Sequence, residues 1–148
     1  MHLDLNTKPA VEAFFDPVSS TISYVVQDPA SNACAVVDSV LDLDYASGRI
    51  KTDSADRMIT FIKDNDLDLQ WIIETHVHAD HLSAAPYIQE QVGGKIGIGE
   101  KITVVQETFG KVFNEGTEFQ RDGSQFDRLF QDGDTYQVGE MTARVMHT

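Results

Sequence analysis

A histidine-rich segment, residues 75–82 (Thr-His-Val-His-Ala-Asp-His-Leu), holds the side chains best suited to chemistry. Three of the five histidines fall in it, at His76, His78 and His81, and Asp80 stands among them. Residues two apart on an extended strand point to the same side, so His76 and His78 can face one ion. Imidazole and carboxylate groups together suit zinc or ferrous iron. The spacing therefore predicts a metal site with His76, His78, Asp80 and His81 as ligands.

Ordinary packing is the alternative explanation for a histidine at the end of a strand. A single histidine there is most often a surface residue or a core residue with a polar partner, and we prefer this interpretation for His2 and His147. Three imidazoles and a carboxylate at alternate spacing are harder to explain by packing, because each buried imidazole needs a polar partner. The cluster is therefore interpreted as functional.

The hydrophobic pattern predicts the elements that position this cluster. β-Branched and aromatic residues between turn formers predict strands over residues 11–15, 21–27, 33–37 and 69–75. Residues 53–66 change to helical spacing, with four apolar side chains on one face. The order strand, helix, strand predicts a βαβ crossover and a partly parallel sheet, with the histidines following one of its strands.

The second half of the chain is predicted to hold shorter elements. In chain order these are a helix over 82–91, a strand over 95–98, a helix over 102–113, a polar loop over 114–124, and strands over 135–138 and 141–146. The last two strands flank Gly139-Glu140, a hairpin signal. The expected fold class is α/β (α+β), in one domain over residues 1–148.

Composition excludes several classes of function. With 11 basic and 24 acidic residues the net charge is −13, which disfavours nucleic-acid and anionic membrane partners. No run of apolar residues approaches the roughly 20 needed to span a membrane, and the start lacks the pattern of a signal peptide. We therefore expect a cytoplasmic protein. Cys34 is the only cysteine, so neither an intrachain disulfide nor a Cys-x-x-Cys site is expected.

The histidine-rich segment resembles a known signature. The run His76-x-His78-x-Asp80-His81 is similar to the H-x-H-x-D-H motif of the metallo-β-lactamase superfamily. Asp38, after Val36 and Val37, resembles the strand-end aspartate of that fold, and Asp132-Gly133-Asp134 with Gly139 resembles its later hairpin. The closest resemblance is to the persulfide dioxygenase and glyoxalase II-like branch, in which T-H-x-H-A-D-H follows an apolar strand.

This resemblance implies an αββα sandwich with a metal site at the edge of the sheet. In hydrolytic members, His76 and His78 would hold a first metal, and Asp80 and His81 a second. In persulfide dioxygenases a single ferrous ion is used, His76 matches a ligand, and His78, Asp80 and His81 would orient groups or transfer protons. The implied cofactor is one or two Zn²⁺ or one Fe²⁺, and Asp80 is the candidate catalytic residue.

The resemblance also implies a function. The leading hypothesis is a persulfide dioxygenase or glyoxalase II-like enzyme acting on a small thiol-derived substrate such as a glutathione conjugate. A dizinc hydrolase of thioesters or other esters is the first alternative, and a metal-binding module without catalysis is the second. Assembly into a homo-oligomer is left open.

The end of the chain departs from the family pattern. Family members supply further ligands from a P-G-H-T segment after a strand like residues 142–146, and His147-Thr148 resembles the lead-in to that segment. We therefore expect the chain to carry the N-terminal portion of the fold, incomplete at its C-terminus, and do not assign His147 as a ligand.

Overall fold

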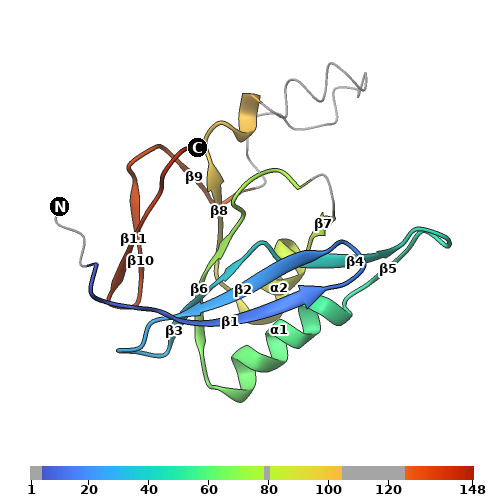
Figure 1. Ribbon diagram of the computed structural model, residues 1–148, viewed down its shortest axis with the longest axis horizontal. Coiled ribbons are helices and arrows are strands. Elements are labelled where there is room, and N and C mark those ends of the chain that lie inside the picture. Colours follow the sequence, from blue (N-terminus) through green and yellow to red (C-terminus); the bar gives the residue numbers. More distant parts are fainter. Residues whose placement is uncertain (1–4, 79–80, 105–125) are drawn as a thin grey trace.

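A six-stranded mixed sheet forms the centre of the protein, which we describe from a computed structural model covering residues 5–78, 81–104 and 126–148 in describable detail (Figure 1). The strand order is β1-β2-β3-β6-β8-β9. Neighbours are antiparallel from β1 to β3 and parallel from β3 to β9. The strands are β1 (Ala10–Asp16), β2 (Thr21–Gln27), β3 (Ala33–Val37), β6 (Asp68–Ile73), β8 (Lys95–Gly99) and β9 (Arg128–Phe130).

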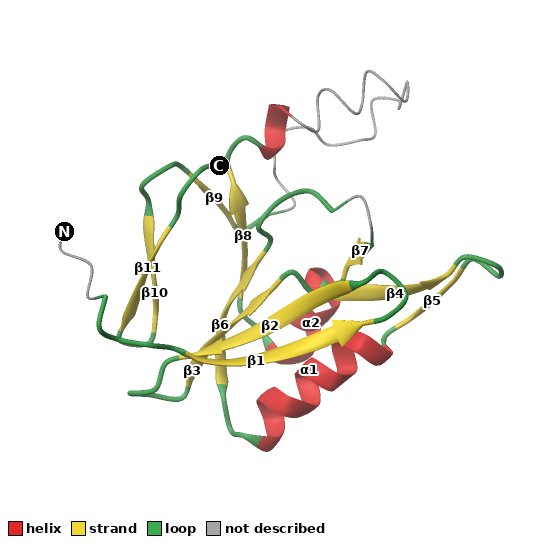
Figure 2. Ribbon diagram, in the orientation of Figure 1, coloured by secondary structure: helices red, strands yellow, loops and turns green. Residues whose placement is uncertain are grey.

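Two helices lie against this sheet (Figure 2). A single apolar cluster joins them to it. Helix α1 (Asp53–Asp64) buries Met58 and Ile62 from its apolar face, and α2 (Ala85–Val92) buries Ile88. Acidic residues in the first turn of α1 and a lysine in its last turn suit the helix dipole. Since α1 connects the parallel neighbours β3 and β6, the expected crossover is confirmed.

A hairpin of β10 (Thr135–Val138) and β11 (Met141–Arg144) packs on the opposite face of the sheet. On β3, Cys34 and Val36 belong to the helix-side cluster, whereas Ala33 and Ala35 contact Val138 of the hairpin. Alternate residues of a strand point to opposite faces, so helices and hairpin lie on different sides of β3. The resulting mixed α/β layers agree with the expected fold class.

A small second sheet lies beside the histidine-rich segment and was not predicted. It has the order β5-β4-β7, with β4 (Val40–Asp44), β5 (Arg49–Lys51) and β7 (Leu82–Ser83). β7 follows His81 directly and pairs with β4, Val40 facing Ser83 and Leu41 facing Leu82. This pairing brings the β4–β5 hairpin next to the candidate ligands.

Most predicted elements are confirmed, with corrections at their ends. The second helix does not begin at residue 82, because the Ser83 hydroxyl donates to Glu74 and accepts the Ala85 amide (3.1 Å), which holds residues 82–83 in β7. The strand predicted over 69–75 spans Asp68–Ile73, the first helix ends at Asp64 rather than 66, and the last strand ends at Arg144 rather than 146. β9 was not predicted.

Parts of two predictions lie outside the described residues. Residues 102–104 are helical, but the remainder of the helix expected over 102–113 and the loop expected over 114–124 fall in the undescribed segment 105–125. Within the described parts of the chain, no helix has the length and apolar character required to cross a bilayer.

Candidate metal centre

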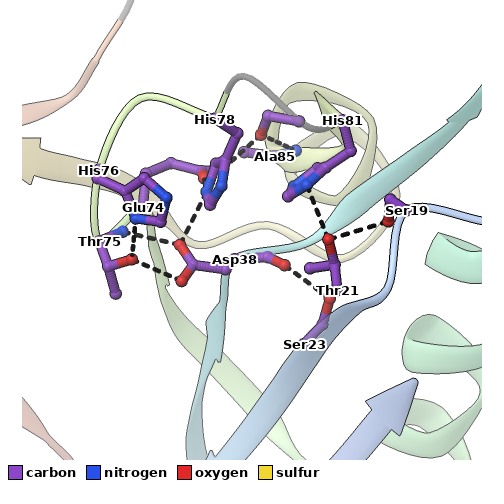
Figure 3. A network of polar contacts seen from close by, with 11 residues as sticks. Ser19, Thr21, Ser23, Asp38, Glu74, Thr75, His76, His78, His81 and Ala85 are labelled. Atoms are coloured by element: carbon purple, nitrogen blue, oxygen red, sulfur yellow. Dashed lines mark hydrogen bonds and ion pairs between the residues drawn. The ribbon is translucent and has the colours of Figure 1, made fainter. Parts of the chain in front are cut away.

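The histidine-rich segment begins where two parallel strands end. Asp38 directly follows β3 and Glu74 directly follows β6, and the Asp38 amide donates to the Ile73 carbonyl (2.9 Å). Parallel strands bring their carboxyl ends to the same edge of a sheet. The side chains after both strands therefore meet at one edge, as Figure 3 shows.

Three imidazoles stand in a row at this edge (Figure 3). The ring centroids of His76 and His78 are 4.3 Å apart, and those of His78 and His81 are 4.2 Å apart. Asp80, the fourth predicted ligand, lies outside the described residues. The structure thus places three of the four predicted site residues side by side.

Asp38 contacts two of these imidazoles, one directly and one through Thr75. Its Oδ1 accepts the Thr75 amide (2.8 Å) and lies 3.0 Å from His78 Nε2. Its Oδ2 accepts the Thr75 hydroxyl (2.6 Å), and that hydroxyl oxygen lies 2.8 Å from His76 Nδ1. One carboxylate therefore organises both rings.

These contacts assign the proton positions on both rings. The Thr75 hydroxyl uses its hydrogen on Asp38, so it accepts from His76, and the proton of His76 sits on Nδ1. His78 Nε2 faces carboxylate oxygens, so its proton sits on Nε2. The neutral rings consequently carry their lone pairs on opposite nitrogens, Nε2 of His76 and Nδ1 of His78.

A second carboxylate, Glu74, also contacts His78. It is 5% exposed, its Oε2 lies 2.9 Å from His78 Nε2, and its Oε1 accepts the Ser83 hydroxyl. Hydrogen bonds to Asp38 and Glu74 raise the pKa of His78 to about 10, although burial acts in the opposite direction. Burial raises the pKa of Asp38, but hydrogen bonds from His78 and Thr75 outweigh it and hold that pKa below its usual value. Asp38 is therefore an anion.

His81 is connected to the β1–β2 turn instead. Its Nδ1 lies 3.1 Å from the Thr21 hydroxyl oxygen, which in turn lies 2.9 Å from the Ser19 hydroxyl oxygen. Asp16 closes this turn, accepting the Ser19 amide (3.0 Å) and hydroxyl (2.6 Å). The turn and the imidazole row are thus one hydrogen-bonded unit.

The residues present fit a cation. Among the described residues, Asp38, His76 and His78 form a group whose ligand atoms all lie within 4.8 Å of one another, and His81 is not part of that group. Because three hydrogen bonds already occupy the two Asp38 oxygens, its role is to orient the imidazoles that would bind the ion. Two imidazoles oriented in this way can hold an ion once His78 has released its Nδ1 proton.

Sequence reasoning had not assigned Asp38, Glu74, Thr75 or Thr21 to the site. The family resemblance had marked Asp38 as a strand-end aspartate, and the structure places it directly after β3 with φ 52°. Aspartate tolerates this left-handed conformation better than most residues, because its short side chain can hydrogen-bond locally. Nothing in the local pattern marks Glu74 or Thr21.

Two cavities border the imidazole row. The larger, about 530 Å³, is lined by Thr75 and His76 together with Tyr136 and Arg144 of the β10–β11 hairpin. The smaller, about 280 Å³, is lined by His78 and His81 together with the β1–β2 turn and β4. A ligand can therefore approach these rings from more than one direction.

Residues 16–147 match the Metallo-beta-lactamase superfamily. The chain belongs to this family. The match includes both Asp38 and the complete histidine-rich segment, so the edge cluster lies in the region that the family shares. Members of this family depend on zinc or iron, and the edge cluster offers a possible metal-binding group.

Two curated relatives illustrate the similarity. A probable metallo-hydrolase of Burkholderia pseudomallei is 55% identical over 138 residues, covering 93% of this chain and 47% of the relative. Glyoxylase B2 of Dictyostelium discoideum is 40% identical over 145 residues, covering 97% of this chain and 50% of the relative. The chain thus spans about half the length of these relatives.

Solved structures confirm the fold. The ETHE1 structure from Myxococcus xanthus superposes with a TM-score of 0.62 at 23% identity, covering 90% of this chain and 45% of that one. A metallo-beta-lactamase structure from Staphylococcus aureus gives a TM-score of 0.67 at 17% identity, covering 97% of this chain and 35% of that one. The metallo-β-lactamase fold expected from the histidine motif is confirmed.

Proposed function

We propose that this protein is a metal-dependent enzyme of the persulfide dioxygenase or glyoxalase II-like type, acting on a small thiol-derived substrate. The observation that carries the proposal is the pair of opposed tautomers. In the neutral rings Asp38 leaves the lone pairs on Nε2 of His76 and Nδ1 of His78, so each ring has one nitrogen held by the protein and one available to an ion. A ring with one nitrogen held by such a partner is typical of a metal-binding histidine.

The proposed ligand set is the one the motif predicted. His76 and His78 would hold the first ion, and His81 extends the row beside His78. Asp80 stays a proposed ligand and catalytic residue on the motif alone, since it lies outside the described residues. Bound zinc would supply Lewis acidity and a water of lowered pKa, whereas ferrous iron would supply chemistry with dioxygen.

The residues around the ligands have separate tasks in this proposal. Asp38 and Glu74 hold the proton of His78 on Nε2, and Thr75 transmits the orientation of Asp38 to His76. Thr21 positions His81 from the other side. The rings are thereby held before substrate arrives, which lowers the cost of ordering them at each turnover.

Support for a thiol-derived substrate comes from similarity. A relative 40% identical to this chain is named Glyoxylase B2, and another, 55% identical, is a probable metallo-hydrolase. The sequence Thr75 to His81 has the T-H-x-H-A-D-H form of the persulfide dioxygenase and glyoxalase II-like branch. A glutathione-derived substrate is the member of this class to test first.

Metal analysis and two assays test the proposal. The purified protein is expected to bind iron or zinc, and His76→Ala with His78→Ala should abolish binding, while His147→Ala, an imidazole outside the row, should not. The iron form is then assayed for oxygen uptake with glutathione persulfide, and the zinc form for hydrolysis of S-lactoylglutathione. Metal binding that survives the double substitution would contradict the site. Metal bound without either reaction would favour a non-catalytic module.

A further inference from the structure

The smaller cavity beside His78 and His81 collects exposed apolar side chains. Tyr45 is 73% exposed, Val18 is 70% exposed and Leu82 is 43% exposed, and all three line it. They come from three separate segments, namely the β4–β5 turn, the β1–β2 turn and β7. Apolar side chains gathered around a concavity mark a binding site more often than apolar residues scattered over a surface.

Two carboxylates line this cavity on the side away from the imidazoles. Asp16 and Asp42 belong to its described lining, in which there is no lysine or arginine. Burial raises the pKa of Asp16, but hydrogen bonds from Ser19 and Val18 outweigh it and keep that pKa below its usual value. Asp42 accepts the amide (2.8 Å) and hydroxyl (2.6 Å) of Ser54. Away from the imidazoles, an anionic group entering the cavity would meet two carboxylates that no lysine or arginine of this lining offsets.

The volume of the cavity further limits which chemical group it can hold. A volume of about 280 Å³ lies just below the roughly 300 Å³ at which most small-molecule pockets begin. The cavity therefore suits one substituent of a substrate rather than a whole peptide conjugate. Because His78 and His81 line the cavity, a substituent bound there would lie next to the proposed ion.

We propose that this cavity binds the uncharged aliphatic or acyl group attached to the substrate sulfur, while any anionic part of the thiol carrier stays outside it. The inference rests on the proposed function, because the metal would hold the sulfur-bearing end of the substrate. Tyr45 is then a specificity-determining residue on a hairpin, and Asp42 a group that rejects carboxylates. The substrate class is a thiol compound with a small neutral substituent.

Cobalt(II) substitution with a matched pair of thiols tests this inference. Bound thiolate gives Co²⁺ a charge-transfer absorption band, which reports binding without turnover. 1-Butanethiol and 3-mercaptopropionate have similar lengths but differ in charge at the far end. We expect 1-butanethiol to bind about tenfold more tightly, since it buries apolar surface and avoids the two carboxylates.

Two variants assign the effect to the cavity. Tyr45→Ala should weaken 1-butanethiol binding about fivefold and leave 3-mercaptopropionate unchanged. Ile50→Ala is the matched control, because Ile50 is an exposed apolar residue (57%) of the same hairpin and does not line the cavity. Asp42→Asn should raise the affinity for 3-mercaptopropionate about threefold and not that for 1-butanethiol.

The outcomes separate the two proposals. Equal affinities for both thiols in the cobalt-loaded wild-type protein, or equal losses for both in Tyr45→Ala, would overturn the assignment of the cavity. Failure of cobalt to bind at all, with no charge-transfer band for either thiol, would instead overturn the proposed metal site. A preference for 1-butanethiol that Tyr45→Ala abolishes would support the cavity.

Discussion

Two aspartates at opposite ends of β3 each accept three hydrogen bonds, but the groups that donate to them differ. Asp28, ahead of the strand, accepts the Glu140 amide (2.8 Å), the Ala30 amide (3.0 Å) and the Ser31 hydroxyl (2.7 Å). Asp38, after the strand, accepts Thr75 twice and His78 once. The Asp28 partners do not titrate or ligate, whereas those of Asp38 lead to two imidazoles.

The difference shows how function is divided along one strand. Asp28 is fully buried and joins the β2–β3 turn to the Gly139-Glu140 turn of the hairpin, so it stabilises the layering of the fold. Backbone amides hold its pKa below the usual value, the Glu140 amide first. Asp38 stands where parallel strands end, and orients side chains that can bind a ligand. Removing the Asp38 carboxylate should therefore weaken metal binding, whereas removing the Asp28 carboxylate should lower stability.

The largest effect is expected from Asp38→Asn. An amide cannot accept from all three donors, so both imidazoles lose their orientation, and we expect metal affinity to fall by about 10- to 100-fold. Asp28→Asn is the matched control and should leave metal affinity unchanged while lowering the unfolding temperature. Competition with a chromophoric chelator measures the affinity. Equal losses of metal affinity in the two variants would contradict the proposed division of roles between Asp38 and Asp28.

Gly139→Ala probes the structural end of β3. Gly139 has φ +59°, and a Cβ there would collide with Asp28, Ser31 and Ala33. We expect the free energy of unfolding to fall by about 2 kcal/mol or more. Gly48→Ala, at φ +70° with open space around it, should cost only about 1 kcal/mol for the backbone conformation. Denaturant unfolding compares them, and indistinguishable losses would argue against a tight contact at Asp28.

Thr75→Val tests the indirect link from Asp38 to His76. Valine keeps the branched shape but removes the hydroxyl that joins the ring to the carboxylate. We expect roughly tenfold weaker metal binding, because His76 loses the partner that fixes its tautomer. Thr75→Ser keeps the hydroxyl and should restore most of the affinity. If serine and valine behaved alike, the hydroxyl would have no orienting role.

The pH dependence of metal binding tests the pairing of His78 with its two carboxylates. With the pKa of His78 near 10, a proton on Nδ1 competes with the metal throughout neutral pH, so affinity should keep rising from pH 6.5 to about 10, by about tenfold per pH unit. Asp38→Asn removes the first cause of this raised pKa, so its affinity should level off at lower pH. Asp28→Asn should follow the wild-type profile. A wild-type plateau just above pH 6.5 would contradict the pairing of His78.

Elements with local signals were predictable. The strands over 21–27, 33–37 and 135–138 have the predicted bounds, because β-branched residues there stand between clear turn formers. The β4–β5 hairpin was missed because it is short and its strands carry charged residues such as Asp42, so no long alternation marks it. β7 was absorbed into a predicted helix, since its pairing with β4 is not visible in the local sequence.

The site was predictable only where its residues are close in sequence. The row of His76, His78 and His81 follows from their spacing, and Asp80 stays a prediction from the same motif. The role of Asp38 depends on Thr75 and His78, which are 37 and 40 positions away. Such a contact exists only after β3 and β6 pair as parallel strands, and that register is not encoded in any one segment.

The opposed tautomers of His76 and His78 are the central claim, and nuclear magnetic resonance of the ¹⁵N-labelled protein loaded with ¹¹³Cd²⁺ tests them most directly. The account predicts coupling from the metal to Nε2 of His76 and to Nδ1 of His78, with the remaining proton on the other nitrogen of each ring. Coupling through the same kind of nitrogen in both rings, or none to either ring, would contradict it.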